Sequence, residues 1–211
     1  MNAVFELGGE LVRPDVAHNL MRLIAEGSGD DEDADVALRR YAAQTYFALL
    51  LKPKLPDVLM EVVCWVLGEY AYLCDGVPLE SVVERLCDVV ERQFTRPSTR
   101  CWVVVAITKL VAQLGTLPEP AQEVAAKFKG SSSVLLAKYC HELEALAVDF
   151  GAMRACLPVD ASCEDLEVDP LLSFVGDYVH RALQQGAQPY LGKGDRPDEI
   201  DVSGPAERGA P

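Results

Sequence analysis

The residues best suited to chemistry in this chain begin with an acidic run, Asp30-Asp31-Glu32-Asp33. Counted from Asp31, an EF-hand calcium loop would find oxygen ligands at its first, third and fifth positions. The same loop needs glycine at the sixth position and glutamate at the twelfth, where this chain has Val36 and Ala42. We therefore interpret the run as carboxylates that stabilise the positive N-terminal end of a helix.

Three histidines, His18, His141 and His180, fall in three different segments of helical periodicity. His141 begins the run HELEA, which lacks the second histidine of a zinc-binding H-E-x-x-H pair. A shared metal or catalytic site would require these segments to converge in the fold, and the spacing of the histidines gives no sign of this.

Two further patterns invite a catalytic or phosphate-binding interpretation. Ser131 to Ser133 follow Gly130, but neither a G-x-S-x-G sequence nor a phosphate loop is present. Gly192-x-Gly194 follows no predicted strand and is typical of a linker. We predict no catalytic, cofactor-binding or metal-ligating residue and no cofactor, and the sequence assigns no protein-interface residue.

Three stretches mimic endocytic sorting signals: Tyr46-Phe-Ala-Leu49, Tyr70-Ala-Tyr-Leu73 and Glu167-x-x-x-Leu171-Leu172. Such signals are read only when they are extended and exposed. The first two lie inside predicted helices and the third overlaps a helix start, so we interpret their aromatic and leucine residues as core. Burying such a side chain contributes about 1.5–3 kcal/mol.

Composition excludes several classes of function. The 211 residues carry a net charge of −14 and no basic stripe, which argues against nucleic-acid binding and against a polybasic membrane anchor. No signal peptide and no membrane-spanning apolar run is visible. We therefore expect a soluble cytosolic protein.

Cysteine usage agrees with a reducing compartment. The number of cysteines is odd, and no two form a C-x-x-C pair. The seven are Cys64, Cys74, Cys87, Cys101, Cys140, Cys156 and Cys163. Most of them lie among apolar residues, so we predict that the cysteines serve as small, buried hydrophobic side chains.

The stretch Leu55–Leu73 predicts a helix that is apolar around most of its circumference. Such a helix has to be covered by other helices on most sides. Its polar or small residues fall on one narrow stripe: Asp57, Glu61, Gly68 and Tyr72. We expect Glu61 to lie on this wetted stripe, Glu69 to lie near a helix end, and Trp65 to pack between adjacent layers.

Proline and glycine divide the rest of the chain into helical segments without a strand signal. The remaining predicted helices are 1–7, 14–27, a segment from the acidic run to 51, 78–94, 97–115, 118–129, 131 or 132 to 156, and 170–186. In the last of them Leu171, Phe174, Val175, Tyr178, Val179 and Leu183 are predicted to face inward.

Helix starts recur at a regular interval. Pro56 and Pro97 are 41 residues apart, and Pro78 and Pro118 are 40 apart. This period is typical of HEAT and armadillo arrays. We predict an all-α solenoid of about four helix pairs over residues 1–186, and a disordered tail or the start of a hinge over 187–211. A closed four-helix bundle is the alternative, but it predicts no repeat period.

Five stretches resemble the large-subunit (adaptin) family of clathrin-type adaptor complexes. They are Val4–Gly27, Val63–Leu73, Thr99–Leu110, Leu157–Asp169 and Leu172–Tyr190, in the family's order. ELGG followed by V-x-P, together with WVLGEY, is similar to gamma and alpha adaptins, whereas PVDASCEDL and QGAQPY favour the epsilon branch. The matching part is the C-terminal portion of the family's trunk domain.

The resemblance implies a HEAT-like scaffold that is not an enzyme. It implies a beta-type adaptin and the mu and sigma subunits as partners, with an Arf GTPase and cargo tails engaged by the complete complex. It also implies peripheral membrane association at the trans-Golgi network through that complex, and cargo sorting toward endosomes. Alternatives are a gamma- or alpha-type adaptin, or an unrelated HEAT scaffold such as a transport receptor or phosphatase regulator; an enzyme ranks last.

The upstream trunk, hinge and ear of the family have no counterpart in this sequence, and the tail from Leu191 does not match. No ligand-binding residue of the family transfers to this chain. We expect a fragment or truncated product whose first helical layer exposes Val4, Phe5 and Leu7, because the preceding layer would be missing.

Overall fold

The computed structural model of the chain describes residues 2–159, 161 and 169–191. This part of the chain contains α-helices and short 3-10 turns and no strand, as the sequence predicts. The chain divides into two compact units, Met1–Glu164 and Asp165–Pro211. The boundary predicted at residue 186 stays a prediction, and the tail from 192 onward lies outside the described residues.

The first unit contains nine of the ten described α-helices. They are α1 (Asn2–Gly8), α2 (Pro14–Glu26), α3 (Glu32–Leu49), α4 (Asp57–Tyr70), α5 (Leu79–Val90), α6 (Thr99–Leu114), α7 (Glu119–Phe128), α8 (Val134–Leu146) and α9 (Phe150–Cys156). Single 3-10 turns follow α1 and α4, namely η1 (Gly9–Leu11) and η2 (Ala71–Leu73).

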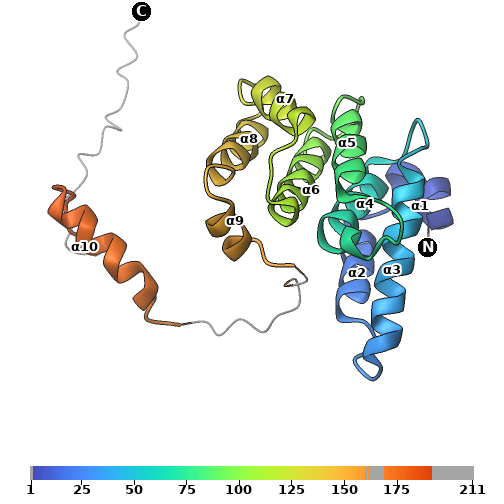
Figure 1. Cartoon of the computed structure of the whole chain (residues 1–211), viewed down its shortest axis with the longest axis horizontal. Coiled ribbons are helices and arrows are strands. Elements are labelled where there is room, and N and C mark those ends of the chain that lie inside the picture. Colours follow the sequence, from blue (N-terminus) through green and yellow to red (C-terminus); the bar gives the residue numbers. More distant parts are fainter. Residues whose placement is uncertain (1, 160, 162–168, 192–211) are drawn as a thin grey trace, which may run out of the picture. The chain divides into compact units, whose positions relative to one another are not determined.

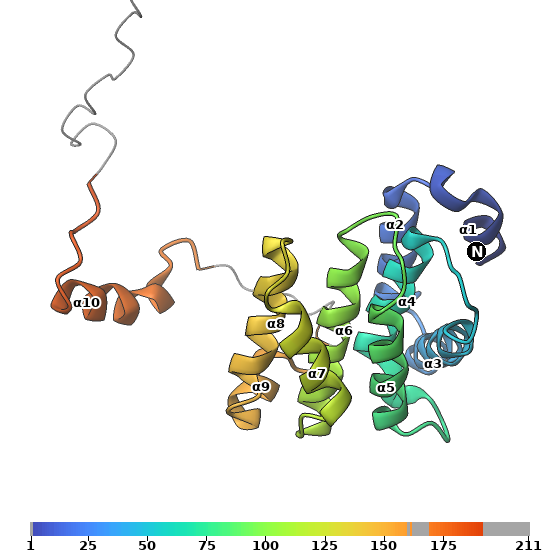
Figure 2. The same cartoon turned by 90° about the horizontal axis from the view of Figure 1, so that it is seen from above.

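The helices of the first unit stack as successive pairs. Helices α2, α4, α6 and α8 pack side by side in this order (Figures 1 and 2). Against this row, α3 packs on α4, α5 on α6 and α7 on α8. The packed pairs α3/α4, α5/α6 and α7/α8, with α2 before them and α9 after them, form the predicted all-α solenoid.

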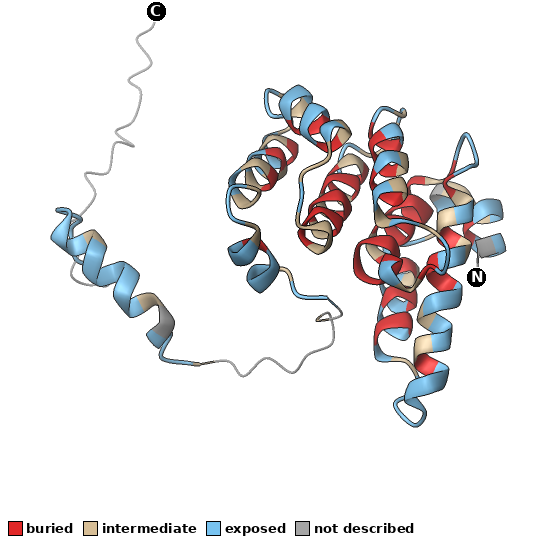
Figure 3. Cartoon of the chain, in the orientation of Figure 1, coloured by how far each residue is buried: buried red, intermediate tan, exposed pale blue. Residues whose placement is uncertain are grey.

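Helix α4 lies at the centre of this stack. It contacts α2 and α3 on one side and α6 on the other. All of its residues except Trp65 are buried (Figure 3). The prediction that other helices cover α4 on most sides is therefore confirmed. The buried residues include Asp57 and Glu61, which the sequence pattern places on a solvent-exposed stripe.

The N-terminal end of α3 confirms the interpretation of the acidic run. Asp31 is the N-cap, and its carboxylate accepts from the Ala34 N–H at 3.1 Å. Glu32 and Asp33 occupy the first turn and are exposed. Asp35 instead folds back on the preceding loop and accepts from the Ser28 N–H at 2.7 Å. These hydrogen bonds hold the pKa of Asp35 below its usual range.

The single helix predicted from Ser131 or Ser132 to Cys156 is wrong in two respects. Ser133 is the N-cap of α8, and its hydroxyl accepts from the Leu136 N–H. The segment then breaks after Leu146, because Asp149 starts a new helix by accepting from the Gly151 and Ala152 N–H groups at 2.9 and 3.1 Å. A capping aspartate between two apolar stretches was the signal for this break.

Arginines from neighbouring elements satisfy the carbonyl ends of four helices, which otherwise lack intrahelical donors. Arg39 donates to Ile24 and Ala25 at the end of α2, and Arg100 donates to Val90 and Arg92 at the end of α5. Arg92 donates to Leu50 and Lys52 just after α3, and Arg154 donates to Ala112 in α6. The stack is therefore tied together by guanidinium groups as well as by apolar packing.

Only some of the apolar residues in the first helical layer are exposed. Val4 is 52% exposed and Leu7 is 90% exposed, as predicted, but Phe5 is fully buried in the common core. The prediction for Phe5 was wrong because α1 packs directly on α4 and covers this face itself.

The second unit contains η3 (Ser173–Val175) and α10 (Gly176–Gln184). Leu172 has a φ of 52° in the left-handed region, so the helix starts after it and not at Pro170. Within this unit Leu171, Tyr178, Val179 and Leu183 are exposed, so the prediction that they face inward was wrong, whereas Val175 is partly buried. The side chain of Phe174 lies outside the described residues.

Candidate functional site

The polar stripe of α4 faces α6 and not water, which corrects the sequence prediction. Asp57, Glu61 and Glu69 are 4%, 2% and 4% exposed, and Gly68 is buried as well. Of the predicted stripe, only Tyr72 is exposed. Since buried carboxylates require partners, the interface between α4 and α6 has to supply them. We call this contact the α4–α6 seam.

At one end of the seam, a single hydroxyl lies between two carboxylates. Thr99 Oγ1 lies 3.2 Å from Asp57 Oδ2 and 3.3 Å from Glu61 Oε1. The Arg96 N–H also donates to Asp57 Oδ2 at 2.5 Å, and Arg96 Nη1 lies 3.5 Å from Glu61 Oε1. A threonine has one O–H hydrogen, so the hydroxyl can donate to only one carboxylate at a time.

Burial raises the pKa of Glu61, although Arg96 and the hydrogen bond from Thr99 oppose the shift. When protonated, Glu61 can itself donate to Thr99 Oγ1, which leaves the Thr99 hydrogen for Asp57. The cluster therefore has a hydrogen-bonded arrangement in both protonation states of Glu61.

At the other end of the seam, Lys109 forms an ion pair with Glu69. Between the two ends the helix backbones approach closely, because a Cβ at Gly68 would lie 3.3 Å from Ala106 Cα. Gln113 Nε2 donates to the Gly68 carbonyl at 3.1 Å. These contacts fix the register between α4 and α6, and they explain why glycine occupies position 68.

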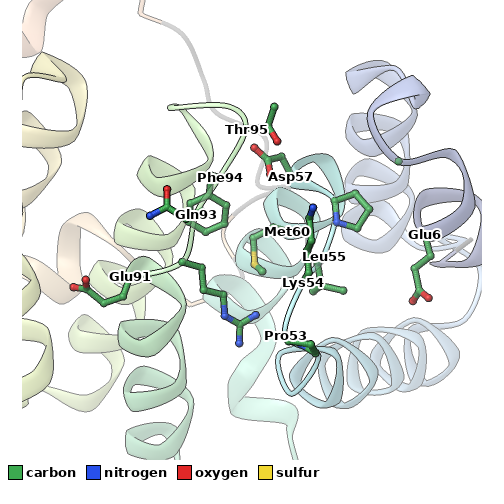
Figure 4. Close-up of a pocket in the computed structure, with 13 residues that line it drawn as sticks. Glu6, Pro53, Lys54, Leu55, Asp57, Met60, Glu91, Gln93, Phe94 and Thr95 are labelled. Carbon is green, nitrogen blue, oxygen red and sulfur yellow. The ribbon is translucent and has the colours of Figure 1, made fainter.

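A surface groove of about 880 Å³ begins where the seam reaches the end of α4. Two loops line it, residues 53–56 before α4 and residues 91–95 after α5, together with Glu6 and Gly9. In Figure 4, Met60 lies between Phe94 of one loop and Leu55 of the other. The groove is lined by charged side chains and the partly exposed Phe94, while Leu55 and Met60 are buried beneath it.

The structure does not bring the histidines together. His18 on α2 and His141 on α8 are exposed in the first unit, and His180 is exposed on α10 in the second. Within residues 2–159, 161 and 169–191 no cluster of histidine, cysteine and carboxylate side chains could hold a metal ion. Gly192 and Gly194 lie outside the described residues.

The tyrosines that begin the first two apparent sorting signals are core residues, as predicted, but the prediction was wrong for Tyr72, which is 41% exposed. Tyr46 and Tyr70 are 4% and 0% exposed and lie within α3 and α4. The prediction was wrong for Leu171 and Leu172, which are 87% and 54% exposed. Glu167, the acidic member of that third stretch, lies outside the described residues.

Five cysteines are buried free thiols, as predicted: Cys64, Cys74, Cys87, Cys101 and Cys140. Burial raises the pKa of each of them. Cys156 is exposed, and Cys163 lies outside the described residues. The buried thiols are packing groups, because their thiolate forms are disfavoured.

Sequence reasoning missed the partners on α6, although the repeat period contained a signal for them. Thr99 follows Asp57 by 42 residues, and Lys109 follows Glu69 by 40 residues. In a stacked array of this period, positions one repeat apart on equivalent helices face each other. A carboxylate paired at this spacing with a donor was therefore a detectable pattern.

Comparisons with known proteins agree with the resemblance found in the sequence. The chain is 43% identical over 206 residues to the AP-4 complex subunit epsilon of Arabidopsis thaliana, covering 93% of this chain and 22% of that protein. The chain is homologous to part of the AP-4 epsilon subunit. The human AP-4 complex subunit epsilon-1 is 38% identical over 201 residues, 94% of this chain and 18% of that protein. The Dictyostelium discoideum subunit is 26% identical over 206 residues.

The chain therefore spans about a fifth of the length of the AP-4 epsilon relatives that it matches. No protein-family model and no solved structure matches it. None of the helices in the described ranges has the length and apolar character needed to cross a bilayer. The epsilon branch of the adaptin family, predicted from PVDASCEDL and QGAQPY, is confirmed.

Proposed function

We propose that this chain is a non-enzymatic scaffold segment of an AP-4-type adaptor complex. In this proposal it contributes stacked helix pairs of a large subunit that assembles with a beta-type adaptin and with mu and sigma subunits. The complete complex engages an Arf GTPase and cargo tails at the trans-Golgi network and sorts cargo toward endosomes.

The observation that carries the proposal is the identity to AP-4 epsilon subunits along nearly the whole chain. The fold supports it in physical terms. Burying α4 on most sides produces a rigid stack, while the polar outer faces of α3, α5 and α7 stay available for protein contacts.

Subunit capture tests the proposal directly. The affinity-tagged chain is co-expressed with the beta, mu and sigma subunits of AP-4, and in parallel with those of the gamma- and alpha-containing complexes. We expect recovery of AP-4 subunits and not of the other two sets. Recovery of a gamma- or alpha-type set would assign the chain to another adaptor, and recovery of none would contradict the scaffold proposal.

A matched variant separates scaffold contacts from loss of folding. Lys109→Met disrupts the α4–α6 seam, whereas Lys127→Met removes an exposed lysine of α7. Capture should fall with Lys109→Met in proportion to its loss of folded protein, measured by circular dichroism. It should persist with Lys127→Met.

A further inference from the structure

The outer face of α3 is acidic at its N-terminal end and carries an apolar stripe along its middle. Leu38 and Tyr41 lie at the centre of this stripe and are 38% and 68% exposed. Figure 3 shows that the helix is exposed along most of its outer side. Contiguous exposed apolar residues are typical of interaction surfaces. We call these two residues, together with the small or uncharged exposed residues at helical spacing around them, the α3 stripe: Ala34, Ala37, Leu38, Tyr41, Gln44 and Ala48.

The corresponding faces of α5 and α7 are polar along their length. The exposed side chains of α5 include Glu80, Glu84 and Asp88, and those of α7 include Gln122 and Glu123. The chain carries a net charge of −14, so acidic outer faces are expected of it. The α3 stripe is the exception. Since an exposed helix face is normally polar, contact with a partner explains the stripe better than contact with water does.

The acidic run adjoins the N-terminal end of the α3 stripe. Of its four carboxylates, only that of Asp31 caps the helix. Arg40, an exposed cation of the same helix, pairs with Asp75 at 3.6 Å and not with the run. The other three carboxylates are exposed and form no ion pair with another described residue: Asp30, Glu32 and Asp33. This end of the stripe therefore presents negative charge that the described part of the chain leaves unpaired.

From these two features we propose that the outer face of α3 binds an amphipathic helix of a partner protein. The partner helix lies antiparallel to α3 and carries lysine or arginine in its last turn. Its apolar side chains cover Leu38 and Tyr41, and its basic last turn lies beside the exposed carboxylates of the acidic run.

The antiparallel orientation follows from charge. It brings the C-terminal end of the partner helix to the N-terminal end of α3, where basic residues favour both the partner's own helix dipole and the carboxylates of α3. The alanines at 34, 37 and 48 leave room for a second helix to approach closely. From Ala34 to Ala48 the stripe extends for about 21 Å, which a partner helix of about four turns would cover.

Two other occupants fit this face less well. An anionic bilayer would be repelled by the acidic run. A second copy of this chain, with its own α3 antiparallel to the first, would bring the end of that helix opposite the run. The lysine there, Lys52, already pairs with Glu6 at 2.8 Å, so it offers the run less positive charge than an unpaired lysine would.

A pair of designed peptides tests the proposal. Both are helix-forming peptides of about 18 residues with the same leucines and alanines on one face. The first has its lysines in the last turn, and the second has them in the first turn. Binding of each fluorescent peptide to the full chain is measured by fluorescence polarisation at physiological salt. We expect the first peptide to bind and the second to bind at least about threefold more weakly, because its lysines lie at the wrong end of an antiparallel pair.

Substitutions in the chain separate the apolar contact from the charge. Tyr41→Ser should weaken binding of the first peptide by at least about tenfold, since it removes the largest exposed apolar side chain of the stripe. Leu38→Ser should act in the same direction. Glu32→Lys combined with Asp33→Lys should weaken binding by at least about fivefold.

The matched control is Glu84→Lys combined with Asp88→Lys. It makes the same charge change on the outer face of α5, which is acidic but has no apolar stripe, and it should change the Kd by less than about twofold. All the replaced residues are exposed, and circular dichroism of each variant checks that it is folded.

Several outcomes would overturn the proposal. Equal weakening by the charge reversals on α3 and α5 would reduce binding to a general attraction between a basic peptide and an acidic protein. A Kd that Tyr41→Ser leaves unchanged, equal binding of the two peptides, or binding of neither would also contradict it. Self-association of the chain that Tyr41→Ser abolishes would assign the stripe to a second copy. None of these results bears on the adaptor assignment, which subunit capture tests separately.

Discussion

Two groups of carboxylates behave in opposite ways in this protein. The acidic run before α3 is exposed and stabilises a helix end through a local N-cap, as its sequence position predicts. The carboxylates of α4 are buried and depend on residues about 40 positions later in the chain. The hydrogen-bond partners of the first group are its neighbours in sequence, whereas those of the second group are neighbours only in the folded structure.

The largest expected effect comes from breaking the ion pair of the seam. Lys109→Met leaves the Glu69 carboxylate buried without a partner, which should cost about 3–5 kcal/mol of unfolding free energy in urea titrations. The control Lys127→Met removes the partner of Glu91, whose side chain is 48% exposed, and should cost less than about 1 kcal/mol. Equal losses of unfolding free energy for Lys109→Met and Lys127→Met would contradict the idea that burial makes the Glu69 ion pair more important than the exposed one.

A smaller effect is expected from the shared hydroxyl. Thr99→Val keeps the shape of the side chain but removes the donor between Asp57 and Glu61, which should cost about 1–3 kcal/mol. Thr108→Val is the matched control, because the Thr108 hydroxyl bonds only the Val104 carbonyl of its own helix. A cost for Thr108→Val as large as for Thr99→Val would contradict a special role for this cluster.

Substitutions in the exposed acidic run before α3 should change the stability of the protein only slightly. Asp31→Ala removes the N-cap of α3 and should lower stability by about 1 kcal/mol in thermal or urea unfolding. Asp33→Asn, which neutralises a residue of the first turn, should change the free energy of unfolding by less than about 0.5 kcal/mol. A larger loss with Asp33→Asn than with Asp31→Ala would mean that the run acts through more than helix capping.

At acidic pH, Glu61→Gln should change the stability of the protein less than any of the variants above. Because the folded pKa of Glu61 is raised, its contribution to stability is fully present below the ordinary glutamate pKa and is lost as pH rises through the folded value. Glutamine cannot ionise, so the variant should match the original chain at pH 4 and gain relative to it at pH 8. A melting-temperature series over this range, with a difference that shrinks as pH rises, would contradict the raised pKa.

Much of the fold could be predicted from the sequence because its signals are local. Prolines, capping residues and apolar periodicity gave the helices, and the spacing of Pro56 and Pro97 gave the stacking. The burial of Glu61 and Glu69 could not be read from α4 alone, since a polar stripe looks the same whether it faces water or another polar stripe. The break at Asp149 was missed because two apolar stretches of similar phase flank it.

The exposed face of α10 marks the other limit of sequence reasoning. Its amphipathic pattern identifies an apolar side without identifying what covers it, and within the second unit Val179 and Leu183 stay exposed. The groove shows the same limit, because Lys54 and Phe94 belong to different loops and only the fold places them together.

The arginines at the helix ends also determine how the stack would respond to a stretching force. Separating α5 from the end of α3 breaks two hydrogen bonds of Arg92, whereas separating α9 from α6 breaks one hydrogen bond of Arg154. Among these guanidinium contacts, the one between α9 and α6 is therefore the weaker. Under tension it should break before the contact between the end of α5 and the end of α3.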